Sequence, residues 1–161
     1  MNELNEHGQP AAGEGARADQ RILRMTPDGK TASSIESVLR QRVDGLAQAI
    51  RDKDVGRLMS FYAPDVVVFD ARPPLYIRGT GAYRQNFERW FDSFEGLLSF
   101  ELKDLRVAPG ESTAFCHYLA LIVGAKPGRK TGYWVRGTTC FERRDGEWLV
   151  THEHISMPSS M

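Results

Sequence analysis

The chain has 161 residues with 21 Lys+Arg and 21 Asp+Glu, so it carries no net charge that would attract nucleic acid or an anionic membrane. Its 41% apolar and 26% charged content is that of a globular domain, and its longest apolar run, Tyr118 to Val123, is far shorter than a membrane span. Two cysteines are too few for a disulfide scaffold, and no apolar stretch follows a basic start at the N-terminus. We therefore expect a reduced, cytoplasmic protein.

Residues 1–33 differ in composition from the rest of the chain. They contain no aromatic residue, whereas all 16 aromatic residues lie between Phe61 and Trp148. Such a segment cannot bury enough apolar surface to offset the entropy lost on ordering. We expect a flexible tail over 1–33 and one folded domain over 34–158.

The domain is predicted to begin with two helices. Ser33 followed by Glu36 has the form of a capping box, and apolar residues then recur at helical spacing as far as Ile50. Asp54 can cap a short second helix, which the sequence Ala63-Pro-Asp65 ends.

A short β-branched strand over 66–69 is predicted next, and it ends at Asp70 before a Pro-rich loop. Thr80 can cap a third helix, whose aromatic face ends at Gly96.

The remainder predicts strands over 98–108, 112–123, 132–144 and 147–157. Pro109-Gly110 and Asp145-Gly146 mark tight connections, and 124–131 is predicted as a longer exposed loop. Early helices and late, long antiparallel strands favour an α+β fold. We expect three N-terminal helices against one face of a curved, mostly antiparallel sheet, which forms a cone with a pocket inside.

This order of elements occurs together with several short sequence motifs. They are Asp52-Lys-Asp-Val, Phe61-Tyr-Ala-Pro-Asp65, Val68-Phe-Asp70 with Arg78-Gly-Thr80, and Phe141-Glu-Arg-Arg-Asp-Gly-Glu-Trp148 with Thr151-His-Glu-His-Ile-Ser156. In these motifs the chain resembles the NTF2-like superfamily, and most closely its SnoaL-like and ketosteroid-isomerase-like branch. The last motif also resembles the association domain of calcium/calmodulin-dependent kinase II. The resemblance implies the cone fold, which hosts both small-molecule enzymes and assembly modules.

The resemblance also implies a site. Isomerase-like members use a pocket carboxylate after the first strand as a proton-shuttling base, and that position is Asp70 here. Their two oxyanion donors fall near Leu46 and Gly137, whose side chains cannot donate a hydrogen bond. This departure argues against steroid isomerisation by that mechanism.

Strand register decides which polar residues meet, because side chains alternate across a strand. A hairpin around 124–132 is predicted to pair 116 with 140, 117 with 139 and 119 with 137. The Asp145-Gly146 turn permits two registers: a two-residue turn puts His152 beside Thr139, and a three-residue turn bulged at Gly146 puts Glu153 beside Gly137. The resemblance favours the second, in which Glu153 faces the pocket.

Three residues are then predicted to carry acid–base chemistry, with Asp70 as the base and His117 and Glu153 as its polar partners. Simpler interpretations stay open: Asp70 as a residue that caps a turn, His117 as a core histidine, and Glu153 as an exposed residue on a sheet edge. The predicted substrate-binding wall consists of Tyr83, Phe87, Trp90, Tyr133 and Thr139.

A second group, His152, His154 and Arg136, is predicted on the opposite face of the sheet. The two histidines have a spacing that can bind metal, but no further ligand completes a set, so we expect a hydrogen-bonding row and no metal. Cys116 and Cys140 fall opposite each other in the predicted hairpin, within disulfide range. Buried free thiols are the favoured interpretation in a reduced cell.

We therefore expect an enzyme that transfers a proton on a small hydrophobic carbonyl compound without a cofactor, in an isomerisation, dehydration or cyclisation. The alternative is a non-catalytic module for ligand binding or oligomeric association. We also expect a homodimer through the sheet face holding Trp134, Trp148 and Ile122, because exposed apolar patches mark contacts.

Overall fold

The computed structural model describes residues 32–158. The predicted tail over 1–33 lies outside them, except that the first helix already includes Ala32 and residue 33. The elements in chain order are α1 (Ala32–Arg51), α2 (Val55–Met59), β1 (Tyr62–Phe69), β2 (Ile77–Arg78), α3 (Thr80–Asp92), β3 (Glu95–Ala108), β4 (Thr113–Lys126), β5 (Arg129–Arg144) and β6 (Glu147–Ser156).

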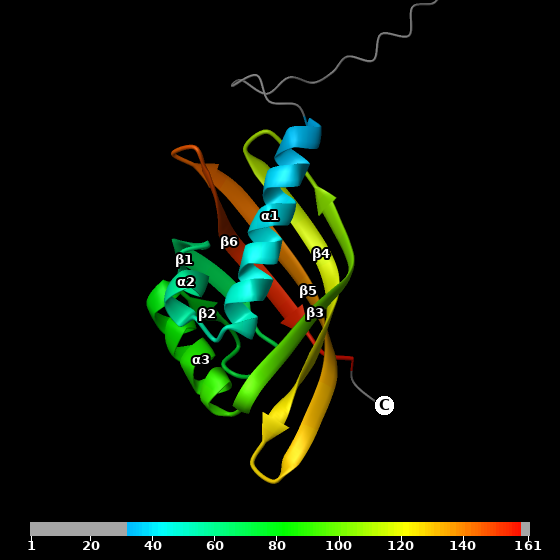
Figure 1. Cartoon of the computed structure of the whole chain (residues 1–161). Coiled ribbons are helices and arrows are strands. Elements are labelled where there is room, and N and C mark those ends of the chain that lie inside the picture. The colour runs from blue at the N-terminus through cyan, green and yellow to red at the C-terminus, as the bar shows by residue number, and fades with distance from the viewer. Residues whose placement is uncertain (1–31, 159–161) are drawn as a thin grey trace, which may run out of the picture.

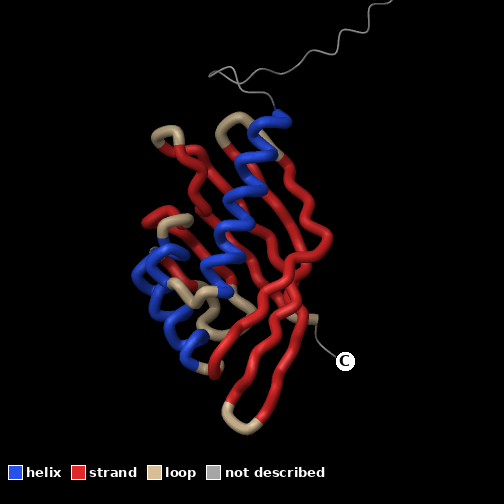
Figure 2. The backbone as a smooth tube through the Cα atoms, in the orientation of Figure 1, coloured by secondary structure: helices blue, strands red, loops and turns tan. Residues whose placement is uncertain are grey.

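The strands form one six-stranded sheet in the order β2-β1-β6-β5-β4-β3. The β1–β6 pair is parallel and the other pairs are antiparallel. Figure 1 shows a strongly curved sheet with the three helices gathered on one side, and Figure 2 shows the same division between helix and strand. The predicted α+β class, with three helices on a curved and mostly antiparallel sheet, is confirmed.

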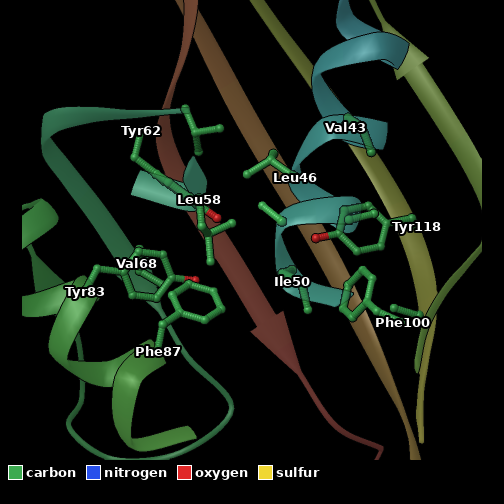
Figure 3. Close-up of a cluster of buried hydrophobic side chains, with 14 of the residues drawn as sticks. Val43, Leu46, Ile50, Leu58, Tyr62, Val68, Tyr83, Phe87, Phe100 and Tyr118 are labelled. Atoms are coloured by element: carbon green, nitrogen blue, oxygen red, sulfur yellow. The ribbon is translucent and has the colours of Figure 1, made fainter. Parts of the chain in front are cut away.

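The helices cover the sheet through apolar stripes. On α1, Leu39, Val43 and Leu46 are buried at helical spacing, and the Arg51 guanidinium ties the end of the helix to β3 by donating to the Phe100 carbonyl at 2.8 Å. Figure 3 shows this stripe facing buried side chains that come from the strands and from α3.

Three helix starts are predicted from capping residues, and one of them is correct. α1 begins at Ala32, so residue 33 lies within the helix and not at its cap. Asp54 caps α2 by accepting a hydrogen bond from the Arg57 amide at 2.9 Å, as predicted. The predicted Thr80 cap of α3 is wrong, because Thr80 is the first helical residue. Gly79 occupies the cap position with φ of 80°, and no side chain caps the helix.

The predicted β4–β5 register is wrong by one residue. The strands run on to a two-residue turn at Pro127-Gly128, where Lys126 pairs with Arg129, so no long loop spans 124–131. Gly128 has φ of 76°, a left-handed conformation that favours glycine. This shorter turn pairs 116 with 139 and 118 with 137, and it turns every side chain of β4 to the face opposite from the predicted one.

The last strand reaches its predicted orientation by a different route. Asp145-Gly146 forms the two-residue turn, since Arg144 pairs with Glu147, but a bulge at Thr151 shifts the register farther along. Before the bulge Val150 pairs with Phe141, and after it Glu153 pairs with Thr139 rather than with Gly137. Glu153 therefore faces the helices, as predicted, although neither predicted register is correct.

These shifts also change the outer face of the sheet. Ile122 and Trp148 are buried in the core, so two of the three residues predicted for the dimer contact cannot form it. Trp134 does lie on the outer face and is 43% exposed. Cys116 pairs with Thr139 rather than with Cys140, and both cysteines are free thiols.

Candidate functional site

A cavity of about 270 Å³ lies between the helices and the concave face of the sheet. Its lining comes from every layer of the fold: Val43, Leu46, Ala47 and Ile50 of α1; Tyr62 of β1; Asp70, Ala71, Arg72 and Pro73 of the following loop; Tyr83, Asn86, Phe87, Arg89, Trp90 and Ser93 of α3 and its end; Phe100, Leu102, Tyr118, Ile122, Tyr133, Val135, Thr139, Glu153, Ile155 and Met157 of the last four strands and the C-terminal end. The wall is mostly aliphatic and aromatic, which suits a small hydrophobic ligand.

Glu153 of β6 is the buried charged group of this cavity, with only 4% of its surface exposed. Its Oε2 accepts hydrogen bonds from the hydroxyls of Tyr83 at 2.6 Å and Tyr62 at 3.1 Å. Its Oε1 accepts from Thr139 at 3.1 Å and, at the limiting distance of 3.5 Å, from Tyr118. Four separate elements, α3, β1, β4 and β5, thus place a hydroxyl on one carboxyl group.

No cation balances that carboxyl. Within 32–158, no Lys, Arg or His forms an ion pair with Glu153. Burial raises the pKa of Glu153 above its ordinary value, the hydroxyl hydrogen bonds from Tyr83, Tyr62 and Thr139 oppose this by lowering it, and the charge of Asp70 raises it further. The net direction is upward, so the acid holds its proton to a higher pH than an exposed glutamate does.

The three tyrosines are shifted in the same direction. Burial first, and then the nearby charge of Glu153, raise the pKa of Tyr62, Tyr83 and Tyr118 well above the ordinary value. These phenols therefore keep their protons and act as hydrogen-bond donors throughout the physiological pH range.

Tyr118 reaches Glu153 because its cross-strand partner is a glycine. Gly137 of β5 pairs with Tyr118, and a Cβ atom at 137 would lie 2.5–2.7 Å from the Cζ, Cε2 and Oη atoms of the ring. The ring crosses the space that a side chain at 137 would occupy, and in Figure 3 the hydroxyl points from β4 into the interior. Gly137 has no side chain that could donate a hydrogen bond, but it leaves room for the Tyr118 hydroxyl of the neighbouring strand to do so.

Asp70 also lines the cavity, directly after β1 and closer to the surface. Its Oδ1 accepts from the Ala71 amide at 2.6 Å, and its Oδ2 accepts from the Asn86 side-chain amide at 2.8 Å. The first bond is the local turn contact that the simpler interpretation predicted. The second ties the loop after β1 to α3.

The predicted aromatic wall is assembled in one place. Tyr83, Phe87 and Trp90 follow one side of α3 with successive ring-centroid distances of 4.7 and 5.9 Å. The Trp90 indole nitrogen donates to the Tyr133 hydroxyl of β5 at 3.1 Å, which joins α3 to the sheet across the cavity. All four line the cavity together with Thr139.

His117 does not join this group, and its predicted placement is wrong. It is exposed on the outer face, because the two-residue turn reverses β4 and brings Tyr118 inward instead. His152 and His154 are on the outer face as predicted: His152 Nδ1 lies 2.8 Å from the Val67 carbonyl, and both rings pack edge-on against Phe69.

The rest of the outer row is only partly as predicted. His154 pairs with Thr138, but Arg136 pairs with Ser156 and donates to the Met157 carbonyl at 3.1 Å. Among the residues that the structure describes, no group of three or more His, Cys, Asp or Glu side chains is placed to hold a metal ion.

Sequence reasoning missed Tyr62 and Tyr118. The sequence predicts that Tyr62 is the last residue of the second helix, but it is the first residue of β1. The predicted pairing of 117 with 139 turns Tyr118 to the outer face, which is wrong. Gly137 is the available signal, because an aromatic ring can cover the space that a glycine leaves on the neighbouring strand.

Comparison with known proteins gives the family. A sequence profile of SnoaL-like domains matches residues 39–160. An NTF2-like protein of unknown function from Pseudomonas putida KT2440 is 33% identical, with a TM-score of 0.74 over 80% of this chain and 90% of that one. No curated protein matches the chain.

More distant structures share the fold alone. A protein of the NTF2-like family from Streptomyces avermitilis, provisionally named a dehydratase, is 19% identical, with a TM-score of 0.72 over 81% of this chain and all (100%) of that one. A ketosteroid isomerase-like protein from Erwinia carotovora atroseptica is 16% identical, with a TM-score of 0.67 over 77% of this chain and 96% of that one. None of the helices among residues 32–158 is long and apolar enough to cross a membrane. The profile match over most of the chain shows that this protein belongs to the family of SnoaL-like domains, within the NTF2-like superfamily.

Proposed function

We propose that this protein is a cofactor-free acid–base enzyme that moves a proton on a small hydrophobic carbonyl compound, in an isomerisation, dehydration or cyclisation. One observation carries the proposal: a carboxyl group without a counter-charge is buried in the wall of an apolar cavity. Burial raises the pKa of Glu153 above its ordinary value, so the group carries its proton to a higher pH and is a stronger base once it has lost it.

The hydroxyls around Glu153 supply the second part of the chemistry. An ionised carboxylate offers about four acceptor sites, and Tyr62, Tyr83, Tyr118 and Thr139 occupy them. Glu153 in its protonated form cannot accept all four hydrogen bonds. A released tyrosine hydroxyl is then free to donate to the carbonyl oxygen of a ligand while that oxygen gains charge.

Asp70 is the second carboxylate of the proposed site. It lies nearer the surface than Glu153, and its charge favours the protonated form of Glu153. Two carboxyl groups whose surroundings differ in this way can divide the roles of acid and base between them. We assign the proton-holding role to Glu153 and the role of base near the mouth to Asp70.

Proton exchange tests the proposal without knowledge of the natural substrate. The α-protons of 2-tetralone in D₂O are followed by NMR with the wild type, Glu153→Gln, Asp70→Asn and the exposed control Glu101→Gln. Wild type and control are expected to accelerate exchange, and Glu153→Gln to lose about 10²-fold or more of that acceleration. Equal rates for the wild type and Glu153→Gln, or no acceleration by the wild type, would refute the proposal.

A binding module without catalysis is the second candidate, and the same hydrogen bonds favour it. Glu153 with all its acceptor sites occupied is also an effective structural hub that fixes four elements of the fold. This candidate is correct if 2-tetralone binds in the cavity and its protons do not exchange faster than in buffer.

A homodimer through the outer face of the sheet stays a prediction. On this face, β4 and β5 expose the apolar residues Phe115, Leu119, Val123 and Trp134, each between 36% and 47% exposed. A contiguous patch of this kind usually marks a protein contact. A cytoplasmic location likewise stays a prediction from the low cysteine content.

A further inference from the structure

The exposed part of the cavity wall carries two positive charges, whereas the buried lining residues that the structure describes carry none. Two arginines line the cavity, Arg72 on the loop after β1 and Arg89 on α3, and both are exposed. Neither forms an ion pair or hydrogen bond with any other residue in the described range 32–158. Two exposed arginines without an ion-pair partner in the described range thus line one cavity.

The Asp70–Asn86 hydrogen bond joins the two segments that carry these arginines. Arg72 follows Asp70 by two residues, and Arg89 follows Asn86 by three residues on α3, nearly one helical turn. Asp70 forms no ion pair with either arginine, because its two oxygens accept from the Ala71 amide and the Asn86 side chain. Its single charge leaves the pair of arginines with a net positive charge.

We infer that the natural ligand is a hydrophobic compound with a carboxylate group, and that Arg72 and Arg89 bind this carboxylate at the mouth. Guanidinium groups match carboxylates in charge and in hydrogen-bond geometry. A carboxylate could not be placed at the buried end of the cavity, because the acid Glu153 has no cation beside it there. The ligand therefore enters with its apolar, reacting end toward Glu153 and leaves its charge at the surface.

This inference rests on the proposed function for what happens at the buried end and deepens it by naming the substrate class. It makes a separate claim about recognition, which binding alone can test. The orientation also gives a reason for the position of Asp70: a carboxylate held by two arginines leaves the rest of the ligand between Asp70 and Glu153.

Isothermal titration calorimetry with 2-naphthoate and 2-naphthamide isolates the charge, because the two probes share the same ring system. The wild type is expected to bind the acid more tightly than the amide, and added salt is expected to weaken only the acid. The double variant Arg72→Gln/Arg89→Gln is expected to bind the acid about tenfold more weakly and the amide unchanged, in line with two exposed ion pairs. The control Arg84→Gln removes an exposed arginine of α3 that does not line the cavity and contacts Glu88 at 4.0 Å, so it should change neither affinity.

The outcomes separate this inference from the proposed function. Equal binding of acid and amide by the wild type, no binding of the acid, or an equal loss of both probes in the double variant would overturn it. The same titration with Glu153→Gln should keep the preference for the acid, even though that variant is expected to lose proton exchange. If the wild type prefers the acid to the amide but does not accelerate proton exchange, the recognition claim is supported and the catalytic proposal fails.

Discussion

Gly137→Ala tests the packing that lets Tyr118 reach the buried carboxyl. The added methyl group would lie 2.5–2.7 Å from three atoms at the end of the Tyr118 ring, closer than real carbon contacts allow. Overpacking of this kind costs roughly 1–3 kcal/mol. Replacing glycine also stiffens the unfolded chain, which returns about 0.4–1 kcal/mol. The hydrogen bond from Tyr118 to Glu153 adds little to the loss, because it is already 3.5 Å long.

We therefore expect Gly137→Ala to lower the free energy of unfolding by about 1.3 kcal/mol, the difference between the midpoints of those two ranges. Tyr118 lines the cavity, so we expect the displaced ring to take up part of it and weaker binding of 2-naphthamide to accompany the loss of stability. Urea denaturation followed by tryptophan fluorescence measures the first effect, and calorimetric titration measures the second.

A matched control lies on the same strand. A Cβ atom at Gly132 would meet its nearest neighbour, Val123 Cγ2, at 3.5 Å, an ordinary contact, so Gly132→Ala should be neutral or slightly stabilising. In a Tyr118→Ala background the cost of Gly137→Ala should disappear, because the clashing ring is gone. If Gly137→Ala is as stable as Gly132→Ala, or if its cost is unchanged without the ring, the packing argument is wrong.

Three further predictions concern charge, assembly and thiols. Because burial raises the native pKa of Glu153 above its ordinary value of 4.5, its contribution to stability is complete below that pH and is lost as pH rises through the native pKa. The stability of the wild type relative to Glu153→Gln in urea titrations should therefore decline as pH rises above 4.5. A flat difference would contradict the raised pKa. Trp134→Glu on the outer face should convert dimers to monomers in sedimentation velocity, and an unchanged dimer would place the contact elsewhere. Burial raises the pKa of the Cys116 thiol to about 12 and also raises that of Cys140. Both thiols should therefore react slowly with Ellman's reagent at pH 8 in the native protein and fast in denaturant. Fewer than two reactive thiols after unfolding would indicate a disulfide.

The fold could be predicted because its signals are redundant. The apolar stripe of α1, the Asp54 cap and the four long late strands each indicate their element independently, and their order is sufficient for an α+β fold with helices on one sheet face. The boundaries of the elements are harder to predict. β1 begins at Tyr62, only three residues after α2 ends at Met59, so the helical and strand patterns overlap in the sequence.

The orientation of β4 could not be predicted, because both of its faces are apolar. Ala114, Cys116 and Tyr118 face the core, while Phe115 and Leu119 face outward. Alternation of polar and apolar residues, which normally fixes a strand, is therefore uninformative here. The orientation depends instead on the two-residue turn at 127–128, and an error of one residue in that turn placed His117 in the cavity and Tyr118 outside it.

The chemistry of the site depends in the same way on one bulged residue. Trp148 and Val150 must face the core to complete it, and strict alternation from them would bring His152 inward and turn Glu153 out. The bulge at Thr151 reverses the alternation, and the parallel pairing of β6 with β1 holds the reversed register by placing Glu153 beside the buried Val68. The cavity consequently contains a carboxyl group among hydroxyls rather than an imidazole. That difference determines the proposed reaction, because burial has opposite effects on the two groups. It raises the pKa of a carboxyl group, so Glu153 retains a proton that it can donate to a carbonyl oxygen. It lowers the pKa of an imidazole, so a histidine in the same apolar surroundings would be neutral and could not act as a charged acid.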